Sequence, residues 1–222
     1  MSFSTALVWL SIHPIYRHLL VLLCGIALAK VMNMVVILWC YSRHNALLWQ
    51  SAIMLLCPSL FLALSFTCDD IFTLCWTLLL SWFLLALCVI DIRCYLLPDK
   101  LTLPLLWLGL ISHSNASTAT LRDAVYGAML GYLAMRGIYW AGKKLIGREG
   151  LGYGDFKLMA ALGAWLGWMS LPLVATFASV LGMVLFLLRY IVTKNSGALP
   201  FGPSLAISGL VIYISQPTLY SG

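Results

Sequence analysis

The chain has 222 residues, of which 63% are hydrophobic and 9% are charged, and its mean hydropathy is +0.99. A soluble domain carries about 25% charged residues, so this composition excludes a water-soluble fold and predicts a protein surrounded by membrane lipid. The net charge is +6, but no basic patch with interleaved aromatic residues accompanies it, so we expect no nucleic-acid partner.

Eight apolar segments follow one another along the chain, and we predict an all-α, polytopic membrane bundle of about eight transmembrane helices. A full span needs about 20 apolar residues, so the fourth, sixth and eighth segments are short. The first residues show no basic region of the kind that opens a signal peptide, so we expect no cleavable leader. The predicted segments are 15–41, 46–67, 71–90, 101–112, 123–141, 156–170, 172–190 and 203–217.

Basic residues gather in the connections on one side of this predicted bundle. Only Arg17 and Arg122 fall on the other side, so the positive-inside rule places the basic side in the cytoplasm. Lys30 and Arg136 fall inside segments, and we expect Arg136 to have a buried partner. The residues on the predicted cytoplasmic side are Arg43, Arg93, Lys100, Lys143, Lys144, Arg148, Lys157, Arg189 and Lys194.

Two aspartates stand at the predicted cytoplasmic boundary of the membrane. Asp91 ends an apolar run, and Asp155 begins another. Either one alone is better explained as a helix cap or as a snorkelling partner for a neighbouring cation, Arg93 or Lys157. Together they suit hydrolysis of an amide: two close carboxyls cannot both ionise easily, so one activates a water while the other, protonated, polarises the carbonyl.

Three glycines, Gly150, Gly152 and Gly154, precede Asp155. Glycine permits backbone conformations with positive φ and lets another backbone approach closely. We therefore expect a narrow loop along which a peptide can lie against Asp155, although a glycine-rich turn between helices has the same pattern. The seven cysteines form no C-x-x-C pair, so we predict no zinc site.

Three sequence elements occur in a recognisable order. Asp91–Asp99 reads DIRCYLLPD, Glu149–Leu158 reads EGLGYGDFKL, and Phe201–Pro203 reads FGP. Together they resemble the type IV prepilin peptidases, the leader peptidases of type IV pilus and type II secretion systems, within the G-x-G-D aspartic proteases. The resemblance implies a single membrane-embedded peptidase domain over 1–222, with N-terminal helices in 1–88 and the catalytic part in 89–222.

The resemblance also implies a substrate and a set of site residues. The substrate would be a prepilin or pseudopilin precursor, which loses its short basic leader after a Gly at the cytoplasmic face of a bacterial inner membrane. Asp91 and Asp155 would be the catalytic pair. The supporting or substrate-binding residues would be Asp99, Gly152, Gly154, Lys157 and Glu149.

The sequence departs from the family pattern in its N-terminal half. Many members carry an insertion with two C-x-x-C pairs that binds zinc, and they methylate the new N-terminus with S-adenosylmethionine. Here the connection after the first segment is only about Ser42 to Asn45. We therefore expect a short form without the zinc-binding tetracysteine insertion, with no metal and no cofactor for cleavage. S-adenosylmethionine enters only if methyltransferase activity exists.

Two other functions fit parts of the pattern. A proton-coupled membrane transporter or channel would use boundary aspartates together with Lys30 and Arg136 as a relay, although the ionisable residues cluster at one face instead of crossing the midplane. An inactive assembly factor would keep the fold and only bind pilins, although both aspartates are retained. The sequence does not specify which pilin is cut or the oligomeric state.

Overall fold

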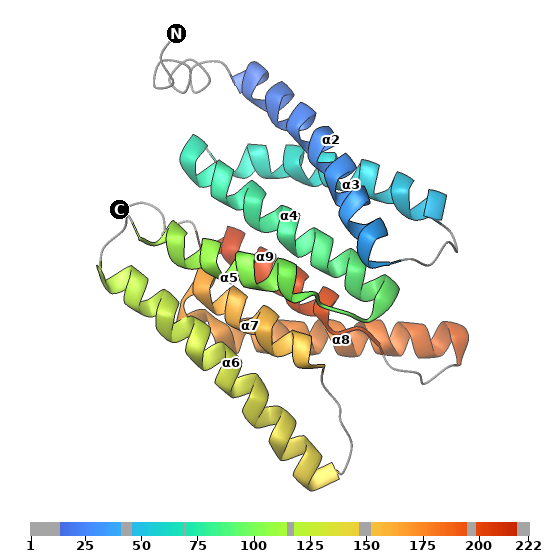
Figure 1. Cartoon of the computed structure of the whole chain (residues 1–222), viewed down its shortest axis with the longest axis vertical. Helices are drawn as coiled ribbons and strands as arrows, with labels where there is room; N and C mark the ends of the chain where they lie inside the picture. Colours follow the sequence, from blue (N-terminus) through green and yellow to red (C-terminus); the bar gives the residue numbers. More distant parts are fainter. Residues whose placement is uncertain are drawn as a thin grey trace. The chain divides into compact units, whose positions relative to one another are not determined.

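The computed structural model describes residues 14–40, 46–68, 70–114, 118–146, 152–194 and 199–216. Within these ranges the chain forms eight α-helices and one 3-10 turn and no strand, which confirms the predicted all-α membrane fold. Each predicted segment corresponds to one helix. In chain order (Figure 1) they are α2 (Pro14–Trp39), α3 (Ala46–Thr67), α4 (Ile71–Cys94), α5 (Asp99–Ser112), α6 (Thr118–Ile146), α7 (Tyr153–Leu166), the turn η1 (Trp168–Ser170), α8 (Leu171–Thr193) and α9 (Gly202–Ser215).

The helices extend beyond several of the predicted segments. α4 continues past Ile90 to Cys94, and α7 begins at Tyr153, so both boundary aspartates lie inside helices. α6 has 29 residues, where the sequence predicts only 123–141. Hydropathy marks the apolar part of a helix, whereas backbone hydrogen bonding continues into the polar turns that flank it.

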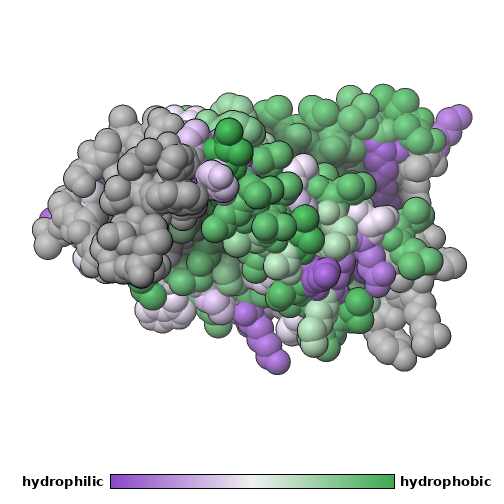
Figure 2. All heavy atoms as spheres, turned by 90° about the horizontal axis from the view of Figure 1, so that it is seen from above, coloured by the Kyte–Doolittle hydropathy of each residue, from purple (hydrophilic) through white to green (hydrophobic). Residues whose placement is uncertain are grey.

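Among the described residues, four helical stretches are long and apolar enough to cross a membrane: Pro14–Trp39, Leu47–Thr67, Ile71–Cys94 and Trp168–Val192. Gly202–Ser215 is a shorter apolar helix. α5 and α7 have 14 residues each, or about 21 Å, which is less than the hydrocarbon core of about 30 Å. Figure 2 shows apolar residues over much of the described surface on the face it presents, as expected for contact with lipid.

Backbone contacts divide the chain into two compact units, Met1–Ala86 and Leu87–Gly222. In the first unit α2 packs against α3. Gly25 makes this approach possible, because a Cβ there would lie 2.9 Å from the Cα of Pro58. The Trp82 indole of α4 donates a hydrogen bond to the Leu28 carbonyl over 3.1 Å. All the site residues predicted from the sequence lie outside this unit.

The second unit is built around α7, which contacts α5, α6 and α9 (Figure 1). Every residue of α7 from Asp155 to Leu166 is buried except Lys157. The Trp165 indole N–H donates a hydrogen bond of 2.8 Å to the Leu105 carbonyl and ties α7 to α5. A helix surrounded in this way gives its first turn a fixed position, and Asp155 lies in that turn.

Glycines bring α6 and α7 into close contact. A Cβ at Gly131 would lie 2.7 Å from the Met159 carbonyl oxygen, and Gly127 meets Gly163 backbone to backbone. Gly127 and Gly131 are four residues apart, so they lie on the same face of α6. Small residues at this spacing let two membrane helices approach closely. This packing fixes the position of α7 along the axis of α6.

Candidate functional site

Asp91 lies in the last turn of α4 and is only 6% exposed. Its Oδ2 accepts a buried hydrogen bond of 2.9 Å from the backbone N–H of Gly202, the first residue of α9. A side chain at that position would collide with the carboxylate, because a Cβ at Gly202 would lie 2.5 Å from Oδ2. The F-G-P element therefore places a hydrogen-bond donor directly on Asp91.

Asp155 lies in the first turn of α7 and is also 6% exposed. Its Oδ2 accepts a hydrogen bond of 3.1 Å from the backbone N–H of Gly152, which precedes the helix. An acidic side chain at this position satisfies a backbone donor and faces the positive end of the helix dipole. The glycine-rich sequence thus ends in a helix cap whose capping group is the candidate catalytic carboxyl.

The structure brings Asp91 and Asp155 close enough for the charge of Asp91 to act on the Asp155 carboxyl. Both are buried, and each is held by one backbone N–H at the start of a helix. Burial and a like charge both disfavour ionising two such carboxyls at once. The pair is therefore able to hold one proton between two acids, which is the state that acid–base hydrolysis requires.

Gly152 and Gly154 act through close packing, and the expected positive φ is wrong for them. Gly152 has φ −76°, Gly154 lies inside α7, and Gly167 alone among the described glycines has a positive φ. A Cβ at Gly154 would lie 2.6 Å from the Cβ of Leu97. The second glycine of G-x-G-D therefore lets the start of α7 pack against the segment that follows Asp91.

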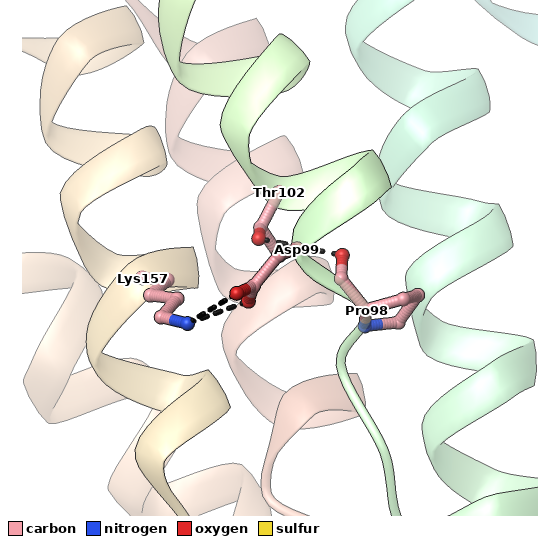
Figure 3. A network of polar contacts seen from close by, with 4 residues as sticks. All are labelled: Pro98, Asp99, Thr102 and Lys157. Carbon is pink, nitrogen blue, oxygen red and sulfur yellow. Dashed lines mark hydrogen bonds and ion pairs between the residues drawn. The ribbon is translucent and has the colours of Figure 1, made fainter.

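Asp99 and Lys157 form an ion pair between α5 and α7 (Figure 3). The Lys157 ammonium donates to both carboxylate oxygens of Asp99, over 2.6 and 2.7 Å. Asp99 begins α5 and Lys157 lies in the second turn of α7, so the pair links these two helix starts. The side chains are 56% and 35% exposed, so solvent weakens their attraction.

An aromatic cluster is formed by Tyr139 on α6 with Tyr153 and Phe156 at the start of α7. The Tyr139 and Tyr153 hydroxyls are 3.2 Å apart and share a hydrogen bond. The Phe156 ring centroid lies 5.6 Å from that of each tyrosine. The sequence analysis missed this cluster; the only signal was the i, i+3 spacing of Tyr153 and Phe156, which places both on one helix face.

The structure bears differently on Glu149, Gly202 and Arg136. Glu149 lies outside the described residues. Gly202 was noted within F-G-P without a role, although Pro203 is typical of a helix start. The buried partner expected for Arg136 is wrong: Arg136 is exposed and donates to the Tyr132 hydroxyl of its own helix, over 3.5 Å.

The contacts place the end of α4 together with the starts of α5, α7 and α9. Gly202 bonds Asp91, Leu97 packs on Gly154, and Asp99 pairs with Lys157. The described residues contain no group of three or more His, Cys, Asp or Glu side chains able to hold a metal ion.

Comparison with known proteins agrees with this chemistry. Residues 78–187 match the model of the type IV leader peptidase family. The chain is 54% identical over 136 residues to a prepilin leader peptidase/N-methyltransferase of Stutzerimonas stutzeri, covering 60% of this chain and 47% of that protein. A protein of the same name from Aeromonas salmonicida is 53% identical over 137 residues, with the same shares covered.

A longer match is to the prepilin leader peptidase/N-methyltransferase of Dichelobacter nodosus, 39% identical over 198 residues, which covers 86% of this chain and 68% of that protein. The chain thus spans about half the length of the first two relatives and two thirds of the third. No solved structure matches. On the family match and the identity to the Dichelobacter protein, the chain belongs to the type IV leader peptidase family.

Proposed function

We propose that this protein is a membrane aspartic endopeptidase that removes the short basic leader from prepilin or pseudopilin precursors, cleaving after a Gly. The observation that carries the proposal is the placement of two buried carboxyls, Asp91 at the end of α4 and Asp155 at the start of α7, where Leu97 packs against Gly154. Membership of the leader peptidase family supports it. The family comparisons give no support to the transporter or channel alternative.

The two carboxyls divide the proton transfers of amide hydrolysis. The ionised member takes a proton from a water molecule as that water attacks the scissile carbonyl carbon. The protonated member donates a hydrogen bond to the carbonyl oxygen and stabilises the tetrahedral intermediate. When the C–N bond breaks, the proton gained from water passes to the leaving amine. Because the backbone N–H groups of Gly152 and Gly202 donate to the Oδ2 atoms of the two aspartates, we assign the reacting water to the two Oδ1 atoms.

The substrate reaches the candidate site from the membrane. A precursor whose apolar helix spans the bilayer presents the residues before that helix at the membrane boundary, with its basic leader on the cytoplasmic side. The helix starts that meet there carry Lys100 and Lys157, and the last turn of α6 carries Lys143 and Lys144. By the positive-inside rule this end faces the cytoplasm, and the membrane is the bacterial inner membrane.

In the proposed mechanism, cleavage by the two carboxyls uses neither a cofactor nor a metal ion. S-adenosylmethionine enters only if the chain also methylates the new N-terminus, an activity that the relatives' names state for those proteins. Prepilin precursors and membrane lipid are the expected partners. The mass of the mature product distinguishes cleavage alone from cleavage with methylation, because a methyl group adds a fixed increment to its N-terminal peptide.

The test uses Asp91→Asn and Asp155→Asn in cells that also express a prepilin. Each substitution keeps the shape of the side chain and removes its acid–base function, so each should abolish leader removal while the protein still inserts. Asp123→Asn is the matched control, since Asp123 lies near the other end of α7 and accepts a bond from Trp168. Gel mobility of the pilin reports cleavage; normal mature pilin with either Asn variant at the site defeats the proposal.

A further inference from the structure

Asp91 occupies an unfavourable place in its own helix. It lies three residues before the end of α4, where the negative end of the helix dipole opposes a carboxylate. It is buried, and the groups on which its charge acts include Asp155 on α7 and the Cys88 thiol one turn earlier on α4. None of these carries a positive charge. A carboxylate in such surroundings needs a donor from elsewhere.

The start of α9 supplies that donor. Gly202 is its first residue and Pro203, the second, has no N–H to offer. Phe201, the N-cap residue of α9, makes no capping hydrogen bond with its side chain. The Asp91 carboxylate therefore serves as the cap of α9, and the dipole of α9 offsets that of α4. The bond joins residues 111 positions apart in the sequence.

The start of α9 packs tightly against Asp91 and also contacts α8. At Gly202 an added Cβ would lie 2.5 Å from Oδ2 and 3.0 Å from Cγ of Asp91. On α8, Gly182 lies next to the start of α9: a Cβ there would make ordinary contacts, 3.5 Å from the Phe201 ring and 3.4 Å from the Ser204 hydroxyl. The donor is held against α8 on one side and against the carboxylate on the other.

We propose that Gly202 is a positioning residue for the reaction: its N–H and its lack of a side chain fix the Asp91 carboxylate and favour its ionised form. The inference rests on the proposed function, because it assigns Gly202 a role in that chemistry. Gly202 acts on the reaction through Asp91 and makes no contact of its own with the scissile bond. Two residues of the F-G-P element then have a role: the Gly202 N–H donates to Asp91, and Pro203 helps to begin α9.

The first test compares Gly202→Ala with Gly137→Ala, a control where an added Cβ meets no described atom within 4 Å. We expect Gly202→Ala to lower kcat for prepilin cleavage by about 10- to 100-fold with little change in KM, since it shifts the reacting carboxylate and leaves the substrate contacts in place. The acidic limb of the pH–rate profile should move to higher pH, because a carboxylate that loses its donor ionises less readily. An unchanged pH profile would overturn the proposal.

The second test measures stability in detergent micelles and needs no activity. Gly202→Ala should lower the apparent unfolding temperature by a few degrees in the wild-type background. In an Asp91→Ala background the colliding oxygen is gone, so the same substitution should cost almost nothing. An equal loss in both backgrounds would mean that Gly202 serves only the packing of α9. If the wild type cleaves no prepilin, the proposed function fails, and this cycle still decides whether Gly202 acts on Asp91.

Discussion

The two carboxylates are held in different ways. Asp155 bonds the N–H of Gly152, three residues away, within the turn that begins its own helix. Asp91 bonds Gly202, 111 residues away, and sits at the unfavourable end of its own helix. One side chain is therefore fixed by local structure, whereas the other depends on how α8 and α9 pack. Substitutions remote in sequence should disturb Asp91 more than Asp155.

The local cap fixes Asp155 relative to α7, but it does not fix α7 relative to Asp91. The contact between Gly154 and Leu97 fixes α7 relative to Asp91. Leu97 follows Asp91 by six residues and packs against the second glycine of G-x-G-D. The contact joins the first turn of α7 to the segment that leaves α4. It sets how far apart the two carboxylates can lie.

Disturbing this contact should have a larger effect than a change at Gly152, at the Asp99–Lys157 pair or at Tyr153. Gly154→Ala places a Cβ 2.6 Å from Leu97 Cβ, and overpacking of this kind costs about 1–3 kcal/mol of stability. A displaced helix start should lower the cleavage rate about 10- to 100-fold. Rates from purified protein, together with its unfolding temperature, check both expectations.

Gly152→Ala is the matched comparison, since its added Cβ lies 3.3 Å from Asp155 Oδ2 and a small shift relieves the contact. We expect it to be milder than Gly154→Ala. If Gly152→Ala proved the more damaging of the two, the local cap and not the contact with Leu97 would control the distance between the carboxylates.

A smaller effect is expected from the Asp99–Lys157 pair, which ties the same helix starts by charge. Asp99→Asn or Lys157→Met should each lower stability by less than about 1 kcal/mol, because the side chains are 56% and 35% exposed. Cleavage should slow by a few-fold, with the double variant no worse than either single one. The difference in cleavage rate between the wild type and these variants should shrink as salt is added.

Additive losses in the double variant would contradict that prediction. In that case each side chain would act separately, for example on the substrate, and Asp99 or Lys157 would belong among the binding residues. A kinetic double-mutant cycle at low and high salt separates the two outcomes, since only a coupled pair loses its coupling when the salt concentration rises.

The sequence was sufficient for the helices and for the position of Asp155. Eight apolar segments have a local signature, and a glycine-rich turn followed by an acidic residue is a local pattern for a helix start. The contacts of Gly202, Leu97 and Asp99 were not predictable in the same way. They join residues as far apart as 58 and 111 positions, and such partners are set by helix packing, which periodicity along one segment does not encode.

The smallest effect should come from Tyr153→Phe, which removes the hydroxyl bond to Tyr139 and keeps the ring beside Phe156. Tyr153 is 59% exposed, so water can replace the lost bond to Tyr139, and we expect a loss of less than about 1 kcal/mol. Tyr126→Phe on the exposed side of α6 is the control for removing a hydroxyl. Cleavage that slows strongly with Tyr153→Phe, while unfolding is unchanged, would place this hydroxyl in contact with the substrate and add a third kind of support to the Asp155 side of the site.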